Sequence, residues 1–387
     1  MNIATWNSNG LASRSHELKT FLKSENIDIM LISETHFTKK NYLKIYNYNI
    51  YTTNHPDAKA HGGTANIIKY NIEHFENTQT STDYIQATSV TVKDTIGYIT
   101  FSAIYCPPRF SINQEKFTEF FKTLGNRFLA GGDYNAKHPW WGSRSISPNP
   151  KGKQLYLTIL SEGLTPISTG EPTYWPSDTK KLPDLIDFAI IKGIDKKRFT
   201  AESCFDLSSD HSPIIIKMDS QIKNKHINNL PYNKQTNWVL YREILNEKIN
   251  CNISLKSNTE LENAIENLNV NIHKALHIAT PHNKLQLKVI NLPQEIIKIK
   301  RKLRAIWQRN RSKHNKRIFN AATRDLKNSI KENINNNIQN YLEKLSPTAN
   351  TDYSLWKATR KINRPQKFIA PLKGDDGAWV REDIKKS

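Results

Sequence analysis

The residues with the clearest chemical potential follow a short apolar run near the middle of the first half of the chain. Residues 128–130 (Phe-Leu-Ala) read as a buried strand, and Gly131-Gly132-Asp133-Tyr134-Asn135 comes directly after it. An acid and an amide two residues apart at a strand end point to the same side. Functional sites of α/β proteins collect at such ends. For this stretch alone a simple turn is the alternative, because turns also prefer Gly, Asp and Asn.

Other polar side chains stand at the ends of further strand-like segments. Taken singly, each is typical of a residue that caps a strand or a turn. Taken together, they predict a shared site. The set consists of Asn7 and Asn9 after residues 2–6, Glu34 and His36 after residues 27–33, Tyr105 ending residues 98–105, Thr173 in a loop, Asp187 opening a strand, and Asp210 and His211 before residues 213–217.

This combination of side chains is suited to hydrolysis of a phosphodiester. The reaction needs a metal ion to stabilise charge on the phosphoryl oxygens, a base to activate water, and a cation or acid near the non-bridging oxygens. Hard oxygen ligands such as Glu34 and Asp210 favour Mg²⁺, with Mn²⁺ as the second choice. The lack of clustered Cys or His residues argues against zinc.

The segments that must position these residues alternate between strand and helix patterns. Helices are predicted around Leu18, Phe21 and Leu22, around residues 117–124, and near residues 154–161. Strands are predicted between them, including two around residues 87–92 and 98–105. We therefore expect an α/β (α+β) fold with strands in the centre and helices outside.

Composition divides the chain near residue 220. Twelve of the fourteen glycines occur at or before Gly193, and the net charge is +2 for residues 1–220 but +18 for residues 221–387. The second part reads as helical throughout. We expect a first domain that holds all the motif residues and suffices for chemistry, followed by a basic helical region.

The strongest basic run is residues 298–317, which contain ten Lys or Arg and no acid. A solvated helix face is the alternative, but the length and single sign of the run favour phosphate contacts. Lys300, Arg301, Arg304 and Arg311 are the predicted contacts. Duplex DNA is the expected partner, with RNA as a competing one.

The overall charge of +20 and pI near 9.6 indicate a polyanionic partner, and a membrane surface is the weaker alternative. Three distant cysteines fit neither a disulfide framework nor a zinc site. No signal-peptide pattern occurs, and no run approaches the ~18 apolar residues of a membrane span. We expect a nuclear protein, made in the cytoplasm, that binds neither a membrane nor a small-molecule cofactor.

Six ordered motifs lie within residues 1–218. They are Thr5-Trp6-Asn7-Ser8-Asn9-Gly10-Leu11, Ser33-Glu34-Thr35-His36, Ile104-Tyr105-Cys106-Pro107-Pro108, Gly132-Asp133-Tyr134-Asn135-Ala136, Asp184-Leu185-Ile186-Asp187 and Ser209-Asp210-His211-Ser212-Pro213. These motifs resemble those of the endonuclease/exonuclease/phosphatase superfamily. Within that superfamily, Asp133 to His138 with Trp141-Gly142-Ser143 is most similar to the endonuclease of jockey-like non-LTR retrotransposons. The resemblance implies a four-layered α/β sandwich of two packed mixed β-sheets flanked by helices.

The resemblance also implies a role for each matching residue. Asn7, Glu34 and Asp210 would bind the metal, and Asn9 would lie in the substrate-binding part of the site. Asp133 would orient or deprotonate the attacking water, and Asn135 would position the phosphate. Tyr105 and Thr173 would contact the scissile phosphate. His211, oriented by Asp187, would stabilise its developing charge.

Residues 219–387 resemble the connector that precedes the reverse transcriptase in these elements, especially residues 352–361. No Tyr-x-Asp-Asp sequence occurs, so no reverse transcriptase activity is expected of this chain. The expected function is Mg²⁺-dependent nicking of duplex DNA that leaves a 3′-hydroxyl for target-primed reverse transcription. A phosphatase or phosphodiesterase of the same fold and an inactive nucleic-acid-binding remnant are the alternatives.

Overall fold

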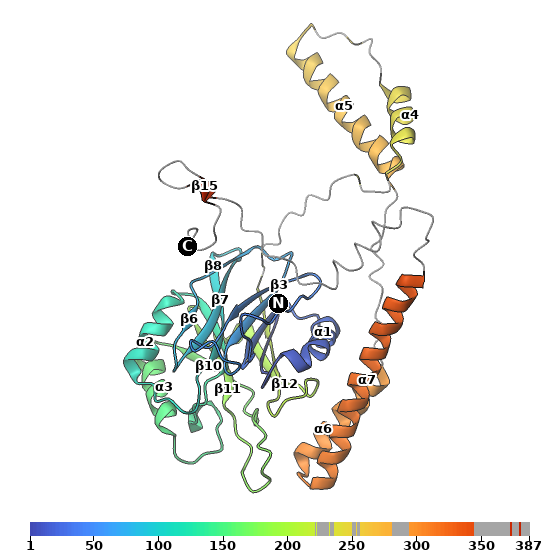
Figure 1. Cartoon of the computed structure of the whole chain (residues 1–387). Coiled ribbons are helices and arrows are strands. Elements are labelled where there is room, and N and C mark those ends of the chain that lie inside the picture. Colours follow the sequence, from blue (N-terminus) through green and yellow to red (C-terminus); the bar gives the residue numbers. More distant parts are fainter. Residues whose placement is uncertain are drawn as a thin grey trace.

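Two β-sheets packed face to face, with helices on their outer sides, make up residues 1–220 (Figure 1). The computed structural model describes residues 1–220, 222, 232, 236–249, 253, 256–280, 294–343, 372–373 and 379–380. The helix–sheet–sheet–helix order confirms the four-layered fold class that the sequence motifs implied.

The first sheet contains the N-terminal strand at its centre. Within residues 1–220 its six strands follow the order β12-β13-β1-β2-β4-β3. Only β1 and β2 pair in parallel among these neighbours. The strands are β1 (Asn2–Asn7), β2 (Ile29–Ser33), β3 (Tyr48–Thr53), β4 (Thr64–Lys69), β12 (Phe199–Ser203) and β13 (Ile214–Met218).

The second sheet has seven strands within the same residues, in the order β10-β11-β9-β8-β7-β5, with β6 also paired to β7. Here β8 and β9 form the parallel pair. The strands are β5 (His74–Glu76), β6 (Thr80–Ser81), β7 (Gln86–Lys93), β8 (Tyr98–Tyr105), β9 (Phe128–Asp133), β10 (Thr165–Ile167) and β11 (Asp187–Lys192).

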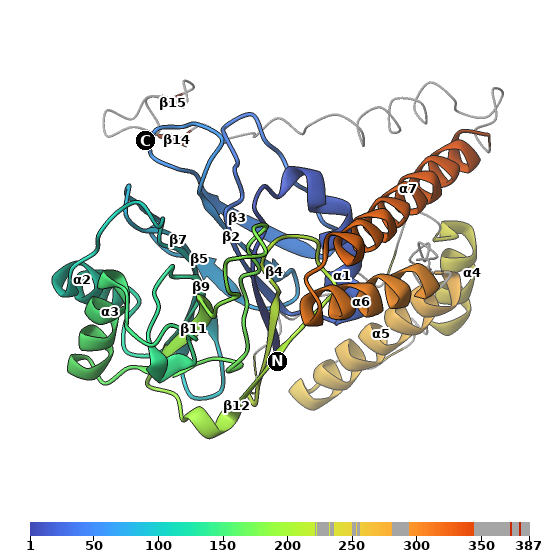
Figure 2. The same cartoon turned by 90° about the horizontal axis from the view of Figure 1, so that it is seen from below.

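Three apolar layers hold these elements together. Residues such as Leu31 and Phe101 form the layer between the two sheets. Helix α1 (Ser15–Ser24) covers the outer face of the first sheet, where Leu18 and Phe21 pack beside Trp6 (Figure 2). Helices α2 (Gln114–Thr123) and α3 (Pro150–Ser161) cover the second sheet. Because both faces of the central strands are buried, those strands read as continuous apolar runs.

The helical predictions follow local rules. The predicted stripe around residues 117–124 is realised in α2, where Phe117, Phe120 and Phe121 are buried. The Asn113 side chain caps this helix by accepting a hydrogen bond from the backbone N–H of Lys116. Three short 3₁₀ turns are also present at Ala12–Arg14, Pro139–Trp141 and Lys196–Arg198.

The second part of the chain forms long helices, as expected from its composition. They are α4 (Trp238–Lys248), α5 (Asn258–Ala279), α6 (Gln294–Arg309) and α7 (Lys313–Glu343). Helices α6 and α7 pack against each other through Ile297, Leu326 and Ile330, and the pair lies beside α1 (Figures 1 and 2). The expectation of helix throughout is wrong at one place, because β14 (Leu372–Lys373) pairs with β15 (Trp379–Val380).

Within the described ranges, no helix is long and apolar enough to cross a bilayer. The longest, α7, carries charged residues along its length.

The two glycines before Asp133 allow close approach of neighbouring backbones. A Cβ on Gly132 would lie 1.9 Å from the carbonyl oxygen of Ile104 in the adjacent strand β8. A Cβ on Gly131 would lie 3.0 Å from the Leu31 side chain in the opposite sheet. The Gly-Gly pair therefore lets β9 lie close to both β8 and the first sheet just before the polar residues begin.

We expect Gly132→Ala to lower the free energy of unfolding by at least about 3 kcal/mol, because β8 and β9 would have to separate. Gly125→Ala is the control. Gly125 has φ +82° but no atom within 4 Å of an added Cβ, so only backbone strain of about 1–2 kcal/mol is expected there. Urea unfolding followed by circular dichroism measures both, and equal losses would contradict the close-approach argument.

Candidate active site

Strand ends from both sheets meet at one edge of the sandwich. In the second sheet, Asp133 at the end of β9 pairs with Tyr105 at the end of β8 and with Asp187 at the start of β11. In the first sheet, Asn7 at the end of β1 pairs with Ser33, which precedes Glu34. Since parallel strands end together and an antiparallel neighbour begins there, the predicted residues converge on this edge.

Asp133 lies at the centre of the site and is buried. Its Oδ2 atom accepts hydrogen bonds from the side-chain amides of Asn7, at 2.8 Å, and Asn135, at 3.0 Å. The backbone N–H of Asn135 donates to Oδ1 at 2.9 Å. Burial, followed by the charge of Asp187, raises the pKa of Asp133 to about 8. The carboxyl group is therefore held in place and can exchange a proton near neutral pH.

His211 forms a buried pair with Asp187, as the sequence analysis expects. The Nδ1 atom of His211 lies 2.7 Å from Oδ2 of Asp187. Burial by itself would lower the pKa of His211, but the charge of Asp187 and the hydrogen bond outweigh it and raise the pKa to about 10. The imidazole ring therefore carries a positive charge across the neutral range.

Asp133, Asp187 and His211 form a compact group, which we call the carboxylate–histidine cluster. One ligating atom from each lies within 4.8 Å of the others. The other described group of this kind is His55, Asp57 and His61, on the loop after β3. The predicted metal ligands Glu34 and Asp210 belong to neither group, so they border the cluster rather than complete it.

Glu34 and Asp210 are each held by a neighbouring polar residue. Burial by itself would raise the pKa of Glu34, but hydrogen bonding from His36 and the charge of His211 outweigh it, so its pKa is lowered. Oδ1 of Asp210 accepts a hydrogen bond from the Asn9 side chain at 3.1 Å. Asn9, Glu34 and Asn135 all adopt positive φ angles, between 43° and 52°. Such backbone is uncommon outside glycine and clusters at functional sites.

Tyr105 is buried beside these acids. Burial, followed by the charges of Glu34 and Asp133, raises the pKa of its hydroxyl group. The phenol therefore stays protonated and remains a hydrogen-bond donor at any physiological pH.

Thr173 is buried beside the start of β11. Its side chain is 0% exposed, and its hydroxyl oxygen accepts hydrogen bonds from the backbone N–H groups of Ile186 and Asp187. Thr173 therefore fixes the start of β11 and, with it, Asp187. Its contact with the scissile phosphate stays a prediction.

The four cations that were predicted to bind phosphate, in α6 and the turn after it, contact residues of the first domain instead. Lys300 is 1% exposed and contacts Glu17, while Arg304 is 0% exposed and contacts backbone carbonyls of residues 209 and 211. Arg301 pairs with Asp206, and Arg311 bonds to backbone carbonyls of residues 176, 178 and 181. The prediction is corrected for Lys300 and Arg304, because buried side chains cannot reach a polyanion in this arrangement.

Two residues that support the site were missed by sequence reasoning. Ser33 donates a hydrogen bond from Oγ to the carbonyl oxygen of Ile104 at 2.6 Å and accepts one from the N–H of Asp133 at 3.2 Å, which ties the two sheets together. Asp184 accepts from Ser143 at 2.8 Å and pairs with Lys137 at 3.1 Å. Asp184 stands in the same motif as Asp187, and Ser33 stands directly before Glu34 in its motif, so membership of these motifs was the available signal.

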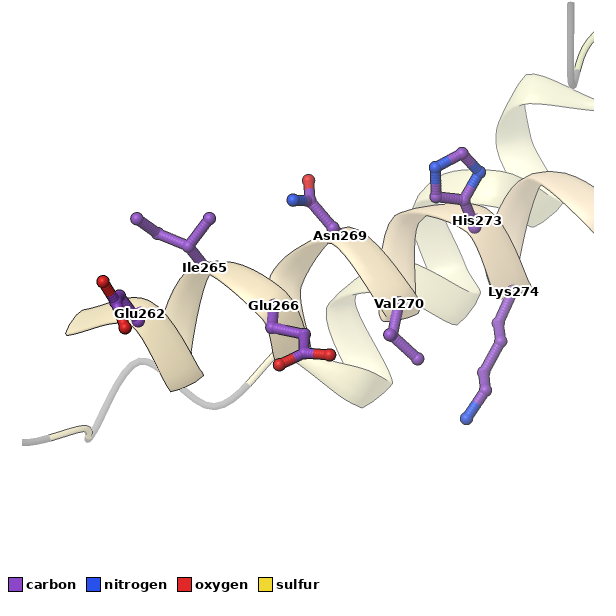
Figure 3. A pocket seen from close by; sticks show the side chains of 7 residues that line it. All are labelled: Glu262, Ile265, Glu266, Asn269, Val270, His273 and Lys274. Atoms are coloured by element: carbon purple, nitrogen blue, oxygen red, sulfur yellow. The ribbon is translucent and has the colours of Figure 1, made fainter. Parts of the chain in front are cut away.

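A surface hollow on α5 is not a competing site. Its lining residues all belong to that single helix, and Figure 3 shows them spread along its length: Glu262, Ile265, Glu266, Asn269, Val270, His273 and Lys274. One helix surface encloses no ligand.

Comparison with known proteins agrees with this geometry. Residues 4–211 match the model of the endonuclease/exonuclease/phosphatase family. Two proteins of Drosophila melanogaster are each 30% identical over the full chain: the probable RNA-directed DNA polymerase from transposon BS and the RNA-directed DNA polymerase from mobile element jockey. The chain spans 43% of the length of each of these relatives.

Solved structures with lower identity are also similar. The endonuclease domain of TRAS1, a telomere-specific non-LTR retrotransposon, is 20% identical with a TM-score of 0.49, covering 56% of this chain and 98% of that one. The AP endonuclease LMAP from Leishmania major is 12% identical with a TM-score of 0.48, covering 56% of this chain and 87% of that one. Because the family model spans more than half of the sequence, this chain belongs to the endonuclease/exonuclease/phosphatase family.

Proposed function

We propose that this chain is a metal-dependent DNA endonuclease of a jockey-like non-LTR retrotransposon. It nicks duplex DNA by phosphodiester hydrolysis and leaves a 3′-hydroxyl for target-primed reverse transcription. The observation that carries the proposal is the carboxylate–histidine cluster, in which a buried carboxyl group held by two amides lies beside a charged histidine. The curated relatives, named as retroelement polymerases, support the biological setting.

Asp133 is the base in this proposal. Asn7 and Asn135 hold one of its oxygens, and its pKa of about 8 matches the pH at which it must take a proton from water. General bases work best when their pKa lies near the working pH. Asp133 therefore orients the attacking water and accepts its proton.

His211 stabilises the charge that develops on the phosphoryl oxygens. Its Nδ1 atom is engaged with Asp187, so Nε2–H is the donor that remains for substrate. A fixed cation in a buried site stabilises a transition state more than it would in water. Tyr105 and Asn135 act with it by donating hydrogen bonds that position the phosphate.

Mg²⁺, or Mn²⁺ in its place, is the proposed cofactor. Glu34, Asp210 and the amide oxygen of Asn7 would hold it, and the bound ion would neutralise charge on the phosphoryl group. The residues fit such an ion because their oxygen donors gather beside two further carboxylates: burial raises the pKa of Asp133, and the charges of Asp187 and Glu34 raise it further. An edge with this much negative charge and oxygen donors suits a hard cation.

Duplex DNA is the proposed substrate, because the second part of the chain is strongly basic. RNA remains a second partner for residues 298–317. The phosphate contacts are assigned to exposed cations of that run and its helices: Lys302, Arg309, Lys313 and Arg317. Because chromosomal DNA is the target, the proposed place of action is the nucleus.

The phosphatase or phosphodiesterase alternative uses the same cluster, since one scaffold serves several substrates. A net charge of +18 on residues 221–387 favours a polymer over a small substrate. The inactive-remnant alternative requires a lost catalytic residue, whereas Asp133, Asp187 and His211 are all present, with ligating atoms within 4.8 Å of one another. We therefore prefer the nuclease.

The first prediction concerns Asp133. Asp133→Ala should lower the rate of nicking by at least about 10²–10³-fold, because the base is lost, while DNA affinity changes little. Conversion of supercoiled plasmid to open circle, with Mg²⁺ and with EDTA, measures the rate. Asp83→Ala, an exposed acid, is the control. Equal rates in parent and Asp133→Ala would refute the assignment.

The second prediction concerns pH. Asp187 raises the pKa of His211, so the imidazolium persists up to about pH 10 in the parent. In Asp187→Asn, burial is opposed only by the charges of Asp133 and Asp210, so the pKa of His211 falls below its value in the parent. The alkaline loss of activity should therefore move to lower pH by at least about one unit. The pH–rate profile and an NMR titration of the histidine ring check this, and an unmoved alkaline limb would speak against the pair.

The third prediction concerns salt. Replacing Lys302, Arg309, Lys313 and Arg317 by Gln should flatten the dependence of log affinity on log salt by up to about 3–4, at about 0.9 per duplex phosphate contacted. Nicking at saturating DNA should barely change, since phosphate contacts position the protein without doing chemistry. Parallel titrations use duplex DNA, single strands and structured RNA. A slope unaltered on all three would identify these residues as a solvated face.

A further inference from the structure

Helix α6 packs along the segment that carries Asp210 and His211. Lys300 contacts both the Glu17 carboxylate and the carbonyl oxygen of Asp206. Arg301 donates to the Asp206 carboxylate at 2.7 Å and to Glu25 at 2.8 Å. These contacts join α6 to helix α1 and to the start of the turn before β13.

Arg304 lies one turn further along α6 than Lys300. It reaches the turn of residues 209–211, which we call the catalytic turn. Its Nη2 atom donates to the carbonyl oxygens of Ser209, at 3.2 Å, and His211, at 2.9 Å. These two carbonyls bracket Asp210 and His211 in the sequence. The guanidinium group therefore fixes the backbone on both sides of a proposed metal ligand and of the proposed charge-stabilising residue.

The same turn is held from the opposite side by strand β1. Trp6 donates from its indole nitrogen to Oγ of Ser209 at 2.8 Å, and Ser209 in turn donates to the carbonyl oxygen of Asn7 at 2.8 Å. The catalytic turn is thus anchored inside the nuclease domain and also by Arg304, which comes from about 95 residues later in the chain. Without Arg304, the carbonyls of Ser209 and His211 lose a shared donor.

Arg304 is also an unusual residue for a packing contact. It is 0% exposed, and burial lowers its pKa to about 10. Burying a guanidinium costs free energy unless its hydrogen bonds compensate, and an apolar side chain of similar size would pack at lower cost. Phe319 of α7 covers the guanidinium group at 5.9 Å from its ring centre. The arrangement therefore favours a role for the two carbonyl contacts over plain packing.

Helix α6 and the turn after it reach a second loop of the site as well. Trp307 lies 6.2 Å, between ring centres, from Trp175. Gln308 donates to Oγ of Ser212 at 3.0 Å, and Arg311 donates to the carbonyl oxygen of Asp178 at 2.8 Å. The segment therefore bridges the loop that includes Thr173, which supports Asp187, and the turn that carries His211.

We propose that α6 is a positioning element of the nuclease active site, and that Arg304 holds the turn of residues 209–211 in its working geometry. The proposal rests on the proposed nuclease function for its kinetic consequence. It also changes the expectation that residues 1–220 suffice for chemistry, because one anchor of the catalytic turn lies in the connector. Small misplacement of a catalytic group costs rate without weakening substrate binding.

The test uses the full chain and the variant Arg304→Met, which keeps an apolar stem of similar length but removes the donor. Arg324→Met, the same substitution at an exposed position of helix α7, is the matched control. In Arg304→Met, backbone amides of residues 206–212 should exchange hydrogen at least about tenfold faster, with sheet and α1 peptides unchanged. The kcat for plasmid nicking should fall by about 10–100-fold with KM unchanged.

Each outcome decides the proposal. Faster exchange together with a lower kcat supports it, whereas an unchanged kcat or unchanged exchange overturns it. If Arg304→Met does not fold, the double variant Arg301→Gln with Gln308→Ala loosens the same docking at partly exposed positions, and the same two readouts apply. If the parent itself does not nick, the proposed function fails, while the exchange comparison still shows whether Arg304 holds the turn.

Discussion

The burial of two carboxylates and a histidine at one edge of the sandwich is the constraint on which the rest of the structure depends. Asp133 and Asp187 carry like charge in a place where burial penalises charge, and Asp133 responds with a pKa of about 8. His211 offsets part of this penalty through its 2.7 Å contact with Asp187. The free-energy cost of burying these three side chains is therefore offset only while they keep their positions relative to one another.

The surrounding structure holds the three side chains in these positions. Gly131 and Gly132 let β9 approach the opposite sheet and strand β8, and Ser33 then joins the two sheets through hydrogen bonds at 2.6 and 3.2 Å. Thr173 fixes the backbone of Asp187 from the loop side. Helix α6 adds Arg304 to the turn that carries His211. Each of these supports contacts backbone atoms and so restrains the position of the site residues. Arg304 is the one among them that also adds a charge near the acidic edge.

The basic second part of the chain consequently has two kinds of cation. Lys300 and Arg304 are buried against the nuclease domain, whereas Lys302 and Arg309 are exposed. Helical periodicity separates them, since residues two apart face different sides of a helix. Burial also explains why net charge alone overstates the number of phosphate contacts, because a cation enclosed by protein cannot approach a polyanion.

Apolar runs and the polar residues that follow them were enough to predict an α/β fold and its functional strand ends, because buried strands are continuously apolar; the four layers came from the motif resemblance. Local patterns did not predict β3, β4 or β12, since the half-buried β3 and β12 mix polar with apolar residues. The contacts of Thr173 with the backbone of β11 and of Arg304 with residues 209 and 211 became known only from the packed structure. Such contacts join segments up to about 95 residues apart. Their partners depend on how whole elements pack, which no local pattern encodes.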